Sequence, residues 1–178
     1  IGKVKTRLAK DIGHVQATFW YRNQLRKLFR TIDSRLPCTR HLFLTPKNGY
    51  RYFKPFAKIG WNIHDQGTGD LGQRMKKALR KVGPGPTILV GSDIPALSAK
   101  HIKSAFSLLN KTDVVLGPAE DGGYWLIGLS RFTEAPNFTN VRWSTKFALS
   151  DTIEQFNTRL SIRLLEKLRD VDSGGDLN

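Results

Sequence analysis

An aspartate directly follows a compact apolar segment in the middle of the chain. Residues 87–91 (TILVG) predict a strand buried on both faces, and Ser92 and Asp93 come straight after it. A carboxylate at the carboxyl end of a strand, beside a glycine that permits close approach, suits a magnesium ion that bridges phosphate oxygens. An aspartate that caps the following turn is the common alternative, and the local sequence leaves both open.

The segment 2–10 (GKVKTRLAK) places three cations at alternating positions, with a glycine and a threonine among them. Such a loop ahead of a helix can hold a polyphosphate through its side chains and backbone N–H groups. A disordered basic terminus is the alternative for a segment of this composition. The segment is not a Walker A loop, because the G-x-x-x-x-G-K-[ST] spacing is absent.

The segment 117–124 (GPAEDGGY) joins two apolar segments and combines two acids with two adjacent glycines. Adjacent glycines let the backbone approach a ligand without a Cβ in the way, which favours a ligand-binding loop. The pair Asp121-Gly122 is also the best short signal for a β-hairpin turn. A plain hairpin needs neither Glu120 nor the aromatic pair Tyr124-Trp125, so we favour the ligand loop.

The segment 170–176 (DVDSGGD) carries three aspartates near the end of the chain. Alternation along an extended backbone sends Asp170 and Asp172 to the same side, and Asp176 follows a flexible turn. Because closely spaced carboxylates repel, we expect a cation or a basic partner nearby. A solvated acidic terminus is the alternative. An EF-hand is excluded because its glycine and its final glutamate are missing.

The excess positive charge is confined to the first half of the chain. The 178 residues carry 29 Lys and Arg against 15 Asp and Glu, a net charge of +14. Residues 1–81 hold 19 basic and 4 acidic side chains, whereas residues 82–178 hold 10 and 11. The basic half indicates an anionic partner (a phosphorylated metabolite, a nucleotide, nucleic acid or anionic lipid) or simply a lineage of high-pI proteins. Nucleic acid is disfavoured, because no helix-turn-helix, RNP or KH signature occurs.

The cysteine and histidine content limits the metal chemistry. The single cysteine, Cys38, excludes an internal disulfide and a cysteine-based zinc cluster, and it predicts a reducing cytoplasm. The four histidines lack ligand-like spacing, and no apolar run approaches the ~18 residues of a membrane span.

The elements that must position these segments alternate along the chain. The predicted helices cover residues 18–36, 73–82, 98–109 and 145–156. The predicted extended segments cover residues 41–45, 87–91, 113–116, 124–129 and 161–165, while residues 46–64 give no clear pattern. The alternation predicts an α/β fold with an open, mainly parallel sheet, in one domain over residues 1–178. Ligands of such sheets bind beyond the carboxyl ends of the strands.

Taken together and in this order, the segments resemble one family. GKVKTRLA, GDLGQRM, GSDIPAL, LGPAEDGGYWLIGL, VRWST and DVDSGGDL resemble bacterial proteins of the type A glycosyltransferase fold, often labelled radical-SAM/selenodomain-associated transferase. This group lies in the nucleotide-diphospho-sugar transferase superfamily. The resemblance implies a three-layer α/β/α fold. It also implies an apolar first strand ahead of the basic loop, which the given sequence lacks.

The resemblance implies roles for individual residues. The residues expected to contact the nucleotide are Gly2, Lys3, Lys5, Thr6, Arg7, Asp70 and Gly72. The residues expected to face the acceptor or the sugar are Glu120, Asp121, Gly122, Gly123 and Tyr124. Asp93 is expected to ligate Mg²⁺ or Mn²⁺, with Asp172 as the second ligand. Asp93, Lys5 and Arg7 are expected to be catalytic, because they stabilise charge on the departing diphosphate or pyrophosphate.

The predicted function is therefore a metal-dependent transferase that acts on a nucleotide-activated substrate. The sequence does not decide between glycosyl transfer from a nucleotide-sugar and nucleotidyl transfer, because both reactions occur on this fold and use a bound metal ion in the same way. The predicted partners are a nucleotide or nucleotide-sugar donor and a small-molecule acceptor that the sequence does not identify. The alternative is a non-catalytic protein that binds a nucleotide or another polyanion.

Overall fold

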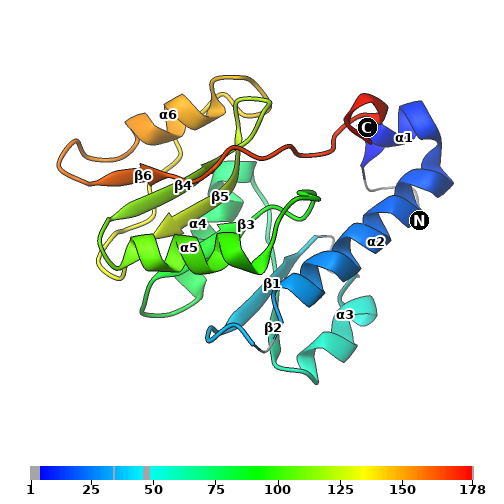
Figure 1. Ribbon diagram of the computed structural model, residues 1–178, viewed down its shortest axis with the longest axis horizontal. Helices are drawn as coiled ribbons and strands as arrows, with labels where there is room; N and C mark the ends of the chain where they lie inside the picture. Colours follow the sequence, from blue (N-terminus) through cyan, green and yellow to red (C-terminus); the bar gives the residue numbers. More distant parts are fainter. Residues whose placement is uncertain (1–4, 34, 46–48, 178) are drawn as a thin grey trace.

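The computed structural model describes residues 5–33, 35–45 and 49–177. In chain order the helices are α1 (Thr6–Ile12), α2 (His14–Thr31), α3 (Tyr50–Ala57), α4 (Leu71–Lys81), α5 (Ala99–Leu109), α6 (Ala148–Glu154) and the short 3-10 helix η2 (Gly174–Leu177). The strands are β1 (Arg40–Leu44), β2 (Trp61–Asp65), β3 (Thr87–Val90), β4 (Val114–Pro118), β5 (Tyr124–Leu129) and β6 (Ile162–Leu164) (Figure 1). Helices and strands alternate, as the sequence predicts. None of the described helices is long and apolar enough to cross a membrane.

The strands form two sheets. β1 and β2 pair in parallel, and the larger sheet has the order β3-β5-β4-β6. β5 runs antiparallel to both β3 and β4, whereas β4 and β6 are parallel. The prediction of a mainly parallel sheet is therefore not confirmed, because the larger sheet is mixed. The physical reason is the short β4–β5 connection, since a parallel pair needs a crossover of about a dozen residues or more.

Helices cover both faces of the larger sheet (Figure 1). On one face, α5 packs its apolar residues Ile102, Ala105 and Leu109 against Val115 and Trp125 of the sheet. The other face packs against α4 and α6 in a second cluster. The buried residues of that cluster are Leu79, Val114, Leu116, Ile127, Leu129, Phe138, Val141, Ala148 and Phe156. The helix–sheet–helix layering agrees with the three-layer fold that the resemblance implies.

An irregularity in the β4–β5 pairing shapes the edge of the sheet where the candidate residues lie. The register shifts between Gly117 and Pro118, so Trp125 of β5 has no partner residue on β4. Such a bulge re-aims side chains, and Trp125 packs with the α5 face while its indole N–H donates to the Glu166 carbonyl at 3.2 Å. A Cβ on Gly117 would lie 2.4 Å from the Trp125 ring, so the bulge requires a glycine there.

The region without a clear sequence pattern contains α3 and β2. Here α3 holds an internal proline, Pro55, which a sequence pattern reads as a helix breaker. Tertiary contacts stabilise the segment instead, because the Phe29 ring of α2 packs on Phe56 at 4.1 Å and on Trp61 at 5.0 Å between centroids. Local sequence patterns do not reveal such packing between aromatic residues that lie far apart in the chain.

Two helices differ in their bounds from the prediction. The predicted helix 18–36 is α2, which begins earlier, at His14, and ends earlier, at Thr31; after it, the Asp33 side chain accepts a hydrogen bond from the Arg35 backbone N–H at 2.9 Å. The predicted helix 145–156 is only α6, and the hydroxyl of Thr145 bonds backbone groups before α6 begins.

The two ends of the described chain lie side by side (Figure 1). The Gly174 N–H donates to the Asp11 carboxylate at 2.7 Å, which joins η2 to α1. Val171 packs with Leu8, Ala9 and Ala17 in a small cluster of buried residues. This cluster places Lys5, at the start of α1, beside the acidic C-terminal turn.

An ion pair between the exposed Arg142 side chain and the buried Asp151 holds the VRWST segment against α6. The Asp151 carboxylate accepts from the Arg142 backbone N–H and from two guanidinium nitrogens, at 2.8–2.9 Å. Hydrogen bonds from the Arg142 side chain, followed by the one from its backbone, lower the pKa of Asp151 to about 2.

We predict that Asp151→Asn flattens the acid limb of the pH–stability profile. A carboxyl whose pKa is lower when folded stabilises the fold above its unfolded pKa of about 3.9. That stabilisation disappears as the pH falls from about 4 to about 2. Thermal unfolding between pH 7 and pH 2 measures it: the variant should be less stable at pH 7, and the gap to wild type should close in acid. A gap that stays constant with pH would contradict the role of this carboxylate.

Candidate functional site

The carboxyl ends of three strands meet at one edge of the larger sheet. Because β3 and β4 are each antiparallel to β5, and β6 is parallel to β4, all three run in the same direction. The connections that follow them carry Asp93, Asp121 and the segment 170–172. Open α/β sheets bind ligands at such an edge. The topology thus gathers the predicted acidic residues, although β5 runs the opposite way.

The Lys5 ammonium joins the two carboxylates that are predicted to bind metal. Lys5 Nζ lies 2.5 Å from Asp93 Oδ2 and 2.7 Å from Asp172 Oδ1. The Lys5 side chain is only 10% exposed, whereas those of Asp93 and Asp172 are 28% and 43% exposed. Burial alone would lower the pKa of Lys5, but the two carboxylates outweigh it and raise the pKa above its ordinary value. Lys5 is therefore held charged between them.

Arg7 extends this arrangement toward solvent. Its guanidinium lies 3.1 Å from Asp172 Oδ2, and its side chain is 65% exposed. Lys5 precedes α1 in a left-handed backbone conformation, with φ of 49°. Thr6 begins α1 and is exposed. Gly2 and Lys3 lie outside the described residues, so their predicted contact with a nucleotide stays a prediction.

Two further carboxylates, those of Asp170 and Asp121, lie close to Lys5, Asp93 and Asp172, the three residues that form the Lys5 cluster. Burial, followed by the negative charge of Asp121, raises the pKa of Asp170 to about 6, and Asp172 and Asp93 contribute as well. The edge of the sheet therefore concentrates negative charge from segments that follow three different strands. Asp170 is a residue that the sequence singled out but ranked below Asp172, and Asp172 is the one that contacts both cations.

The third aspartate of the closing motif shapes the turn. Asp176 accepts hydrogen bonds from the Ser173 hydroxyl and backbone N–H and from the Asp172 N–H, at 2.7–3.1 Å. The hydrogen bonds from Ser173 are the main reason that the pKa of Asp176 is lowered to about 2. The acidic segment is thus an organised turn in which one carboxylate holds the backbone and another, Asp172, faces the cations.

Tyr21 and Ser92 belong to the site, and the sequence assigned neither of them to it. The Tyr21 hydroxyl and the Ser92 hydroxyl are hydrogen-bonded at 2.9 Å, directly beside Asp93. Burial raises the pKa of Tyr21, so its hydroxyl stays protonated. The Val171 N–H donates to the Asp93 carbonyl at 3.2 Å. The adjacency of Ser92 to Asp93 is a usable signal in the sequence, whereas Tyr21 lies within the predicted helix 18–36, where no local motif marks it.

The loop predicted to face an acceptor is the turn of a β-hairpin. The Ala119 N–H donates to the Gly123 carbonyl at 3.0 Å and the Gly122 N–H to the Ala119 carbonyl at 3.2 Å. Gly122 has φ of 85°, and a Cβ there would lie 2.4 Å from the Lys146 backbone. Gly122 thus leaves room for the Lys146 backbone, whereas the sequence favours the interpretation that the glycines leave room for a ligand.

Glu120 and Tyr124 have partners within the protein. The Glu120 carboxylate lies 3.8 Å from the Arg169 guanidinium, and its side chain is 58% exposed. The Tyr124 hydroxyl points inward and accepts from the Thr152 hydroxyl at 3.3 Å, and burial raises its pKa. Of this segment, Glu120 and Asp121 keep exposed side chains that a ligand could reach.

Asp70 and Gly72 serve the start of α4. Asp70 is the N-cap, and its carboxylate accepts from the Gln73 N–H at 2.8 Å in a capping box. A Cβ on Gly72 would lie 2.6 Å from Phe138, so this glycine is required by packing. Their predicted contact with the base or ribose stays a prediction, since both have structural reasons for their identity.

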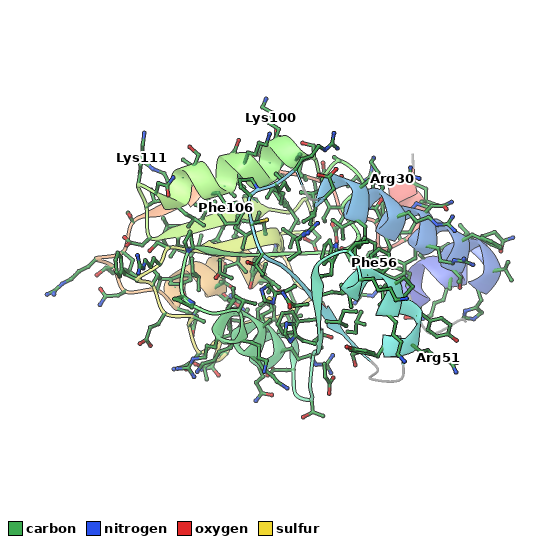
Figure 2. All side chains as sticks on the ribbon, turned by 90° about the horizontal axis from the view of Figure 1, so that it is seen from below. Arg30, Arg51, Phe56, Lys100, Phe106 and Lys111 are labelled. Atoms are coloured by element: carbon green, nitrogen blue, oxygen red, sulfur yellow. The ribbon has the colours of Figure 1, made fainter. Side chains whose placement is uncertain are left out.

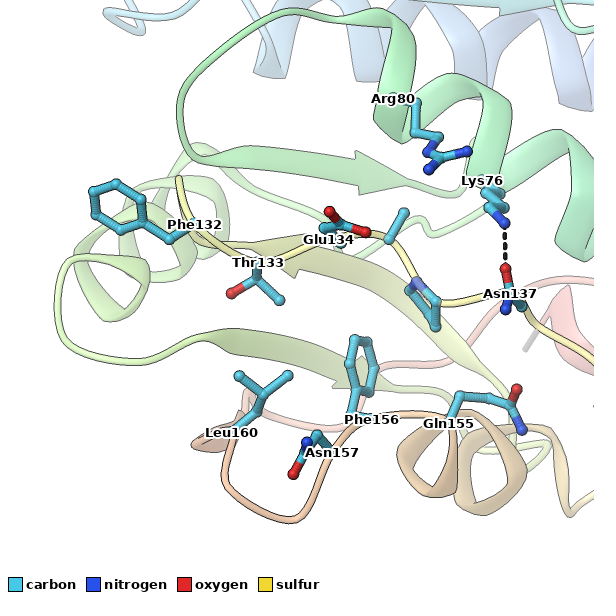
Figure 3. A pocket seen from close by; sticks show the side chains of 12 residues that line it. Lys76, Arg80, Phe132, Thr133, Glu134, Asn137, Gln155, Phe156, Asn157 and Leu160 are labelled. Atoms are coloured by element: carbon cyan, nitrogen blue, oxygen red, sulfur yellow. Dashed lines mark hydrogen bonds between the residues drawn. The ribbon is translucent and has the colours of Figure 1, made fainter.

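A polar cavity of about 290 Å³ lies toward the opposite edge of the sheet (Figure 3). Lys76 and Arg80 of α4 line one side of it, and segments after β5 and after α6 line the others. The Lys76 ammonium donates to the Asn137 side chain. The cavity shares no residue with the Lys5 cluster.

Comparison with known proteins places the chain in a family. Residues 28–145, more than half of the sequence, match a family described as uncharacterized proteins conserved in bacteria (DUF2064). The chain belongs to the DUF2064 family. No curated protein matches it.

Solved structures extend the comparison. The DUF2064 chain is similar to a protein from Desulfovibrio desulfuricans G20, provisionally described as a nucleotide-diphospho-sugar transferase. The identity is 33% and the TM-score 0.88, over 99% of this chain and 79% of the other. A homologue of Mycobacterium tuberculosis rv0371c from Mycobacterium sp. strain JC1 is 19% identical with a TM-score of 0.46, over 76% and 69% of the chains, too distant to bear on function. The nucleotide-diphospho-sugar transferase superfamily is thereby supported, and the narrower radical-SAM/selenodomain label stays a prediction.

We predict that Gly122→Ala lowers the free energy of unfolding by about 1–3 kcal/mol, because the new Cβ overlaps the Lys146 backbone at a left-handed φ. Gly123→Ala is the matched control, since its Cβ would meet only the movable Asp121 carboxylate at 3.0 Å. Chemical denaturation of both variants measures the difference. Equal stability of the two would show that Gly122 has no such structural role.

Proposed function

We propose that this DUF2064 protein is a metal-dependent transferase that acts on a nucleotide-activated substrate. It would move either a glycosyl group from a nucleotide-sugar or a nucleotidyl group. The observation that supports this proposal is the convergence of Asp93 and Asp172 on one cationic point, occupied by the Lys5 ammonium. The similarity to a protein described provisionally as a nucleotide-diphospho-sugar transferase supports the same class of substrate.

The two carboxylates fit a divalent ion only together with a ligand. Among the described residues, no group of three or more His, Cys, Asp or Glu side chains is arranged to hold a metal ion. Mg²⁺ needs six oxygens and commonly takes one or two carboxylates plus substrate phosphates and waters. Asp93 and Asp172 match that pattern, because both already contact a single cation. A bound ion would neutralise charge on the departing diphosphate or pyrophosphate.

The protein's own groups bind and orient the phosphates. Lys5 and Arg7 present ammonium and guanidinium donors beside the carboxylates, and phosphate oxygens are strong acceptors for both. Tyr21 holds Ser92, and the Val171 N–H holds the Asp93 carbonyl, so the backbone that carries Asp93 is fixed from two sides. A group that is already fixed in position lowers the barrier, because it needs no rearrangement as charge develops on the leaving group.

A nucleotide-binding protein without turnover is the second candidate. One observation favours it: Lys5 occupies the point between the carboxylates where a transferase would hold its ion. Product analysis separates the possibilities. Release of a nucleoside diphosphate indicates glycosyl transfer, release of pyrophosphate indicates nucleotidyl transfer, and neither product would support the second candidate.

We expect nucleoside diphosphates, triphosphates or nucleotide-sugars to stabilise the protein more strongly with Mg²⁺ or Mn²⁺ than without. A ligand at 100 times its Kd adds about 2.7 kcal/mol of stability. For a chain of this size that corresponds to a rise in Tm of roughly 5–10 °C. A thermal-shift screen with and without metal measures it. Failure of every nucleotide to raise Tm in either condition would overturn the proposal.

We predict that Asp93→Asn and Asp172→Asn each remove the metal-dependent part of nucleotide affinity. The loss should be on the order of tenfold or more, in line with about 1.5–3 kcal/mol for a hydrogen bond to a charged group. Asp33→Asn is the matched control, because Asp33 pairs with Arg35 away from the cluster. Calorimetry with and without Mg²⁺ measures the affinities. An unchanged Mg²⁺ effect in Asp172→Asn would remove Asp172 from the site.

A further inference from the structure

One face of α2 combines positive charge with exposed apolar side chains. Val15, Phe19, Arg22, Arg26 and Arg30 follow one another at spacings of four, three, four and four, which aligns them along the helix. The side chains of Val15 and Phe19 are 59% and 58% exposed. The buried residues Ala17, Gln24 and Leu28 lie on the opposite side of α2. The aligned side chains therefore face away from the core.

A groove between α2 and α3 continues this face. Its volume is about 550 Å³, and its floor is formed by Phe29, Phe56 and Ile59. Arg26, Arg30 and Arg35 surround it. In the view of Figure 2, Phe56 lies between Arg30 of α2 and Arg51 of α3. An apolar floor inside a cationic rim fits a partner with an anionic surface and an apolar interior.

The second helix adds the same two kinds of side chain. Within α3, Arg51 and Lys54 are exposed, and the ring of Tyr52 is 67% exposed. Ile59 follows α3 and is 63% exposed. Neither α2 nor α3 contains an acidic residue. Among the described residues that line the groove, Asp33 is the one carboxylate, and Arg35 neutralises it with a closest approach of 2.6 Å.

We propose that one surface of the protein docks on an anionic lipid bilayer. This α2–α3 face consists of the aligned exposed side chains from Val15 to Arg30 on α2 and the exposed side chains from Arg51 to Ile59 in and after α3. Its cations complement acidic headgroups. Its exposed Val15, Phe19 and Ile59 can enter the boundary between headgroups and acyl chains, as the apolar side chains of interfacial helices do. The aliphatic members favour lipid over nucleic acid, because bases stack on aromatic rings and gain little from valine or isoleucine. The face excludes the Lys5 cluster, so this inference goes beyond the proposed transferase activity.

Vesicle co-sedimentation of the whole protein tests the proposal. The protein should bind vesicles of phosphatidylglycerol mixed with phosphatidylcholine but not vesicles of phosphatidylcholine alone, and salt should weaken the binding. Arg26→Gln/Arg30→Gln should weaken it on the order of tenfold or more. The matched control is Arg159→Gln/Arg163→Gln, an equal loss of charge at exposed positions around β6, far from α2 in Figure 1.

A second variant separates insertion from simple charge attraction. Phe19→Ser should also weaken vesicle binding while leaving its salt dependence unchanged, because no charge is altered. Circular dichroism and Tm verify that each variant is folded. Failure of the wild type to bind acidic vesicles, an equal loss in the control pair, or binding to nucleic acid in place of vesicles would overturn the proposal. The rise in Tm with nucleotide measures the proposed transferase site independently of vesicle binding, because none of these substitutions lies in the Lys5 cluster.

Discussion

The contact of one ammonium with two carboxylates joins three distant parts of this chain. Lys5 comes from the start of α1, Asp93 from the connection after β3 and Asp172 from the C-terminal turn. Each carboxylate, left alone at this edge, would face the charge of its neighbours, and burial followed by such neighbouring charges raises the pKa of Asp170. The Lys5 ammonium at this point offsets that repulsion and adds to the Asp11–Gly174 hydrogen bond and the Val171 packing that join the two ends of the described chain. The same crowding of charge makes the position suitable for phosphate and metal chemistry.

The direction of the strands explains why the carboxylates gather where they do. β3, β4 and β6 point the same way, and each is followed by a segment that carries acidic residues. The one reversed strand, β5, adds a tight hairpin between β4 and the VRWST segment, and Gly122 lets the Lys146 backbone close on that hairpin. The hairpin thereby packs against the segment before α6 and carries Asp121 close to Asp170.

The net charge of +14 hides a separation of charge within the molecule. Acidic side chains concentrate at the sheet edge, where Lys5 and Arg7 meet them, whereas α2 and α3 carry cations with no acidic residue of their own. The two regions can therefore attract different kinds of partner: phosphates with a metal ion at the first, and an extended anionic surface at the second. The Tyr21–Ser92 hydrogen bond shows that α2 contributes to both.

The sequence by itself determined the elements whose pattern is local, and tertiary structure decided the rest. Apolar runs predicted β3 and β5, but β3 is only half-buried at one end of the strand order and is not the strand buried on both faces that its sequence predicts. The spacing of apolar residues predicted α4 and α5, and motif order pointed to Asp93 and Asp172. The Asp121-Gly122 pair and the short connection were local signals for the reversal of β5. Only the folded chain placed Lys5 between the two carboxylates, formed α3 around Pro55 and brought Tyr21 to Ser92. The physical reason is range: periodicity and turn chemistry act within a few residues, whereas ion pairs, aromatic packing and strand pairing join residues that no local pattern relates.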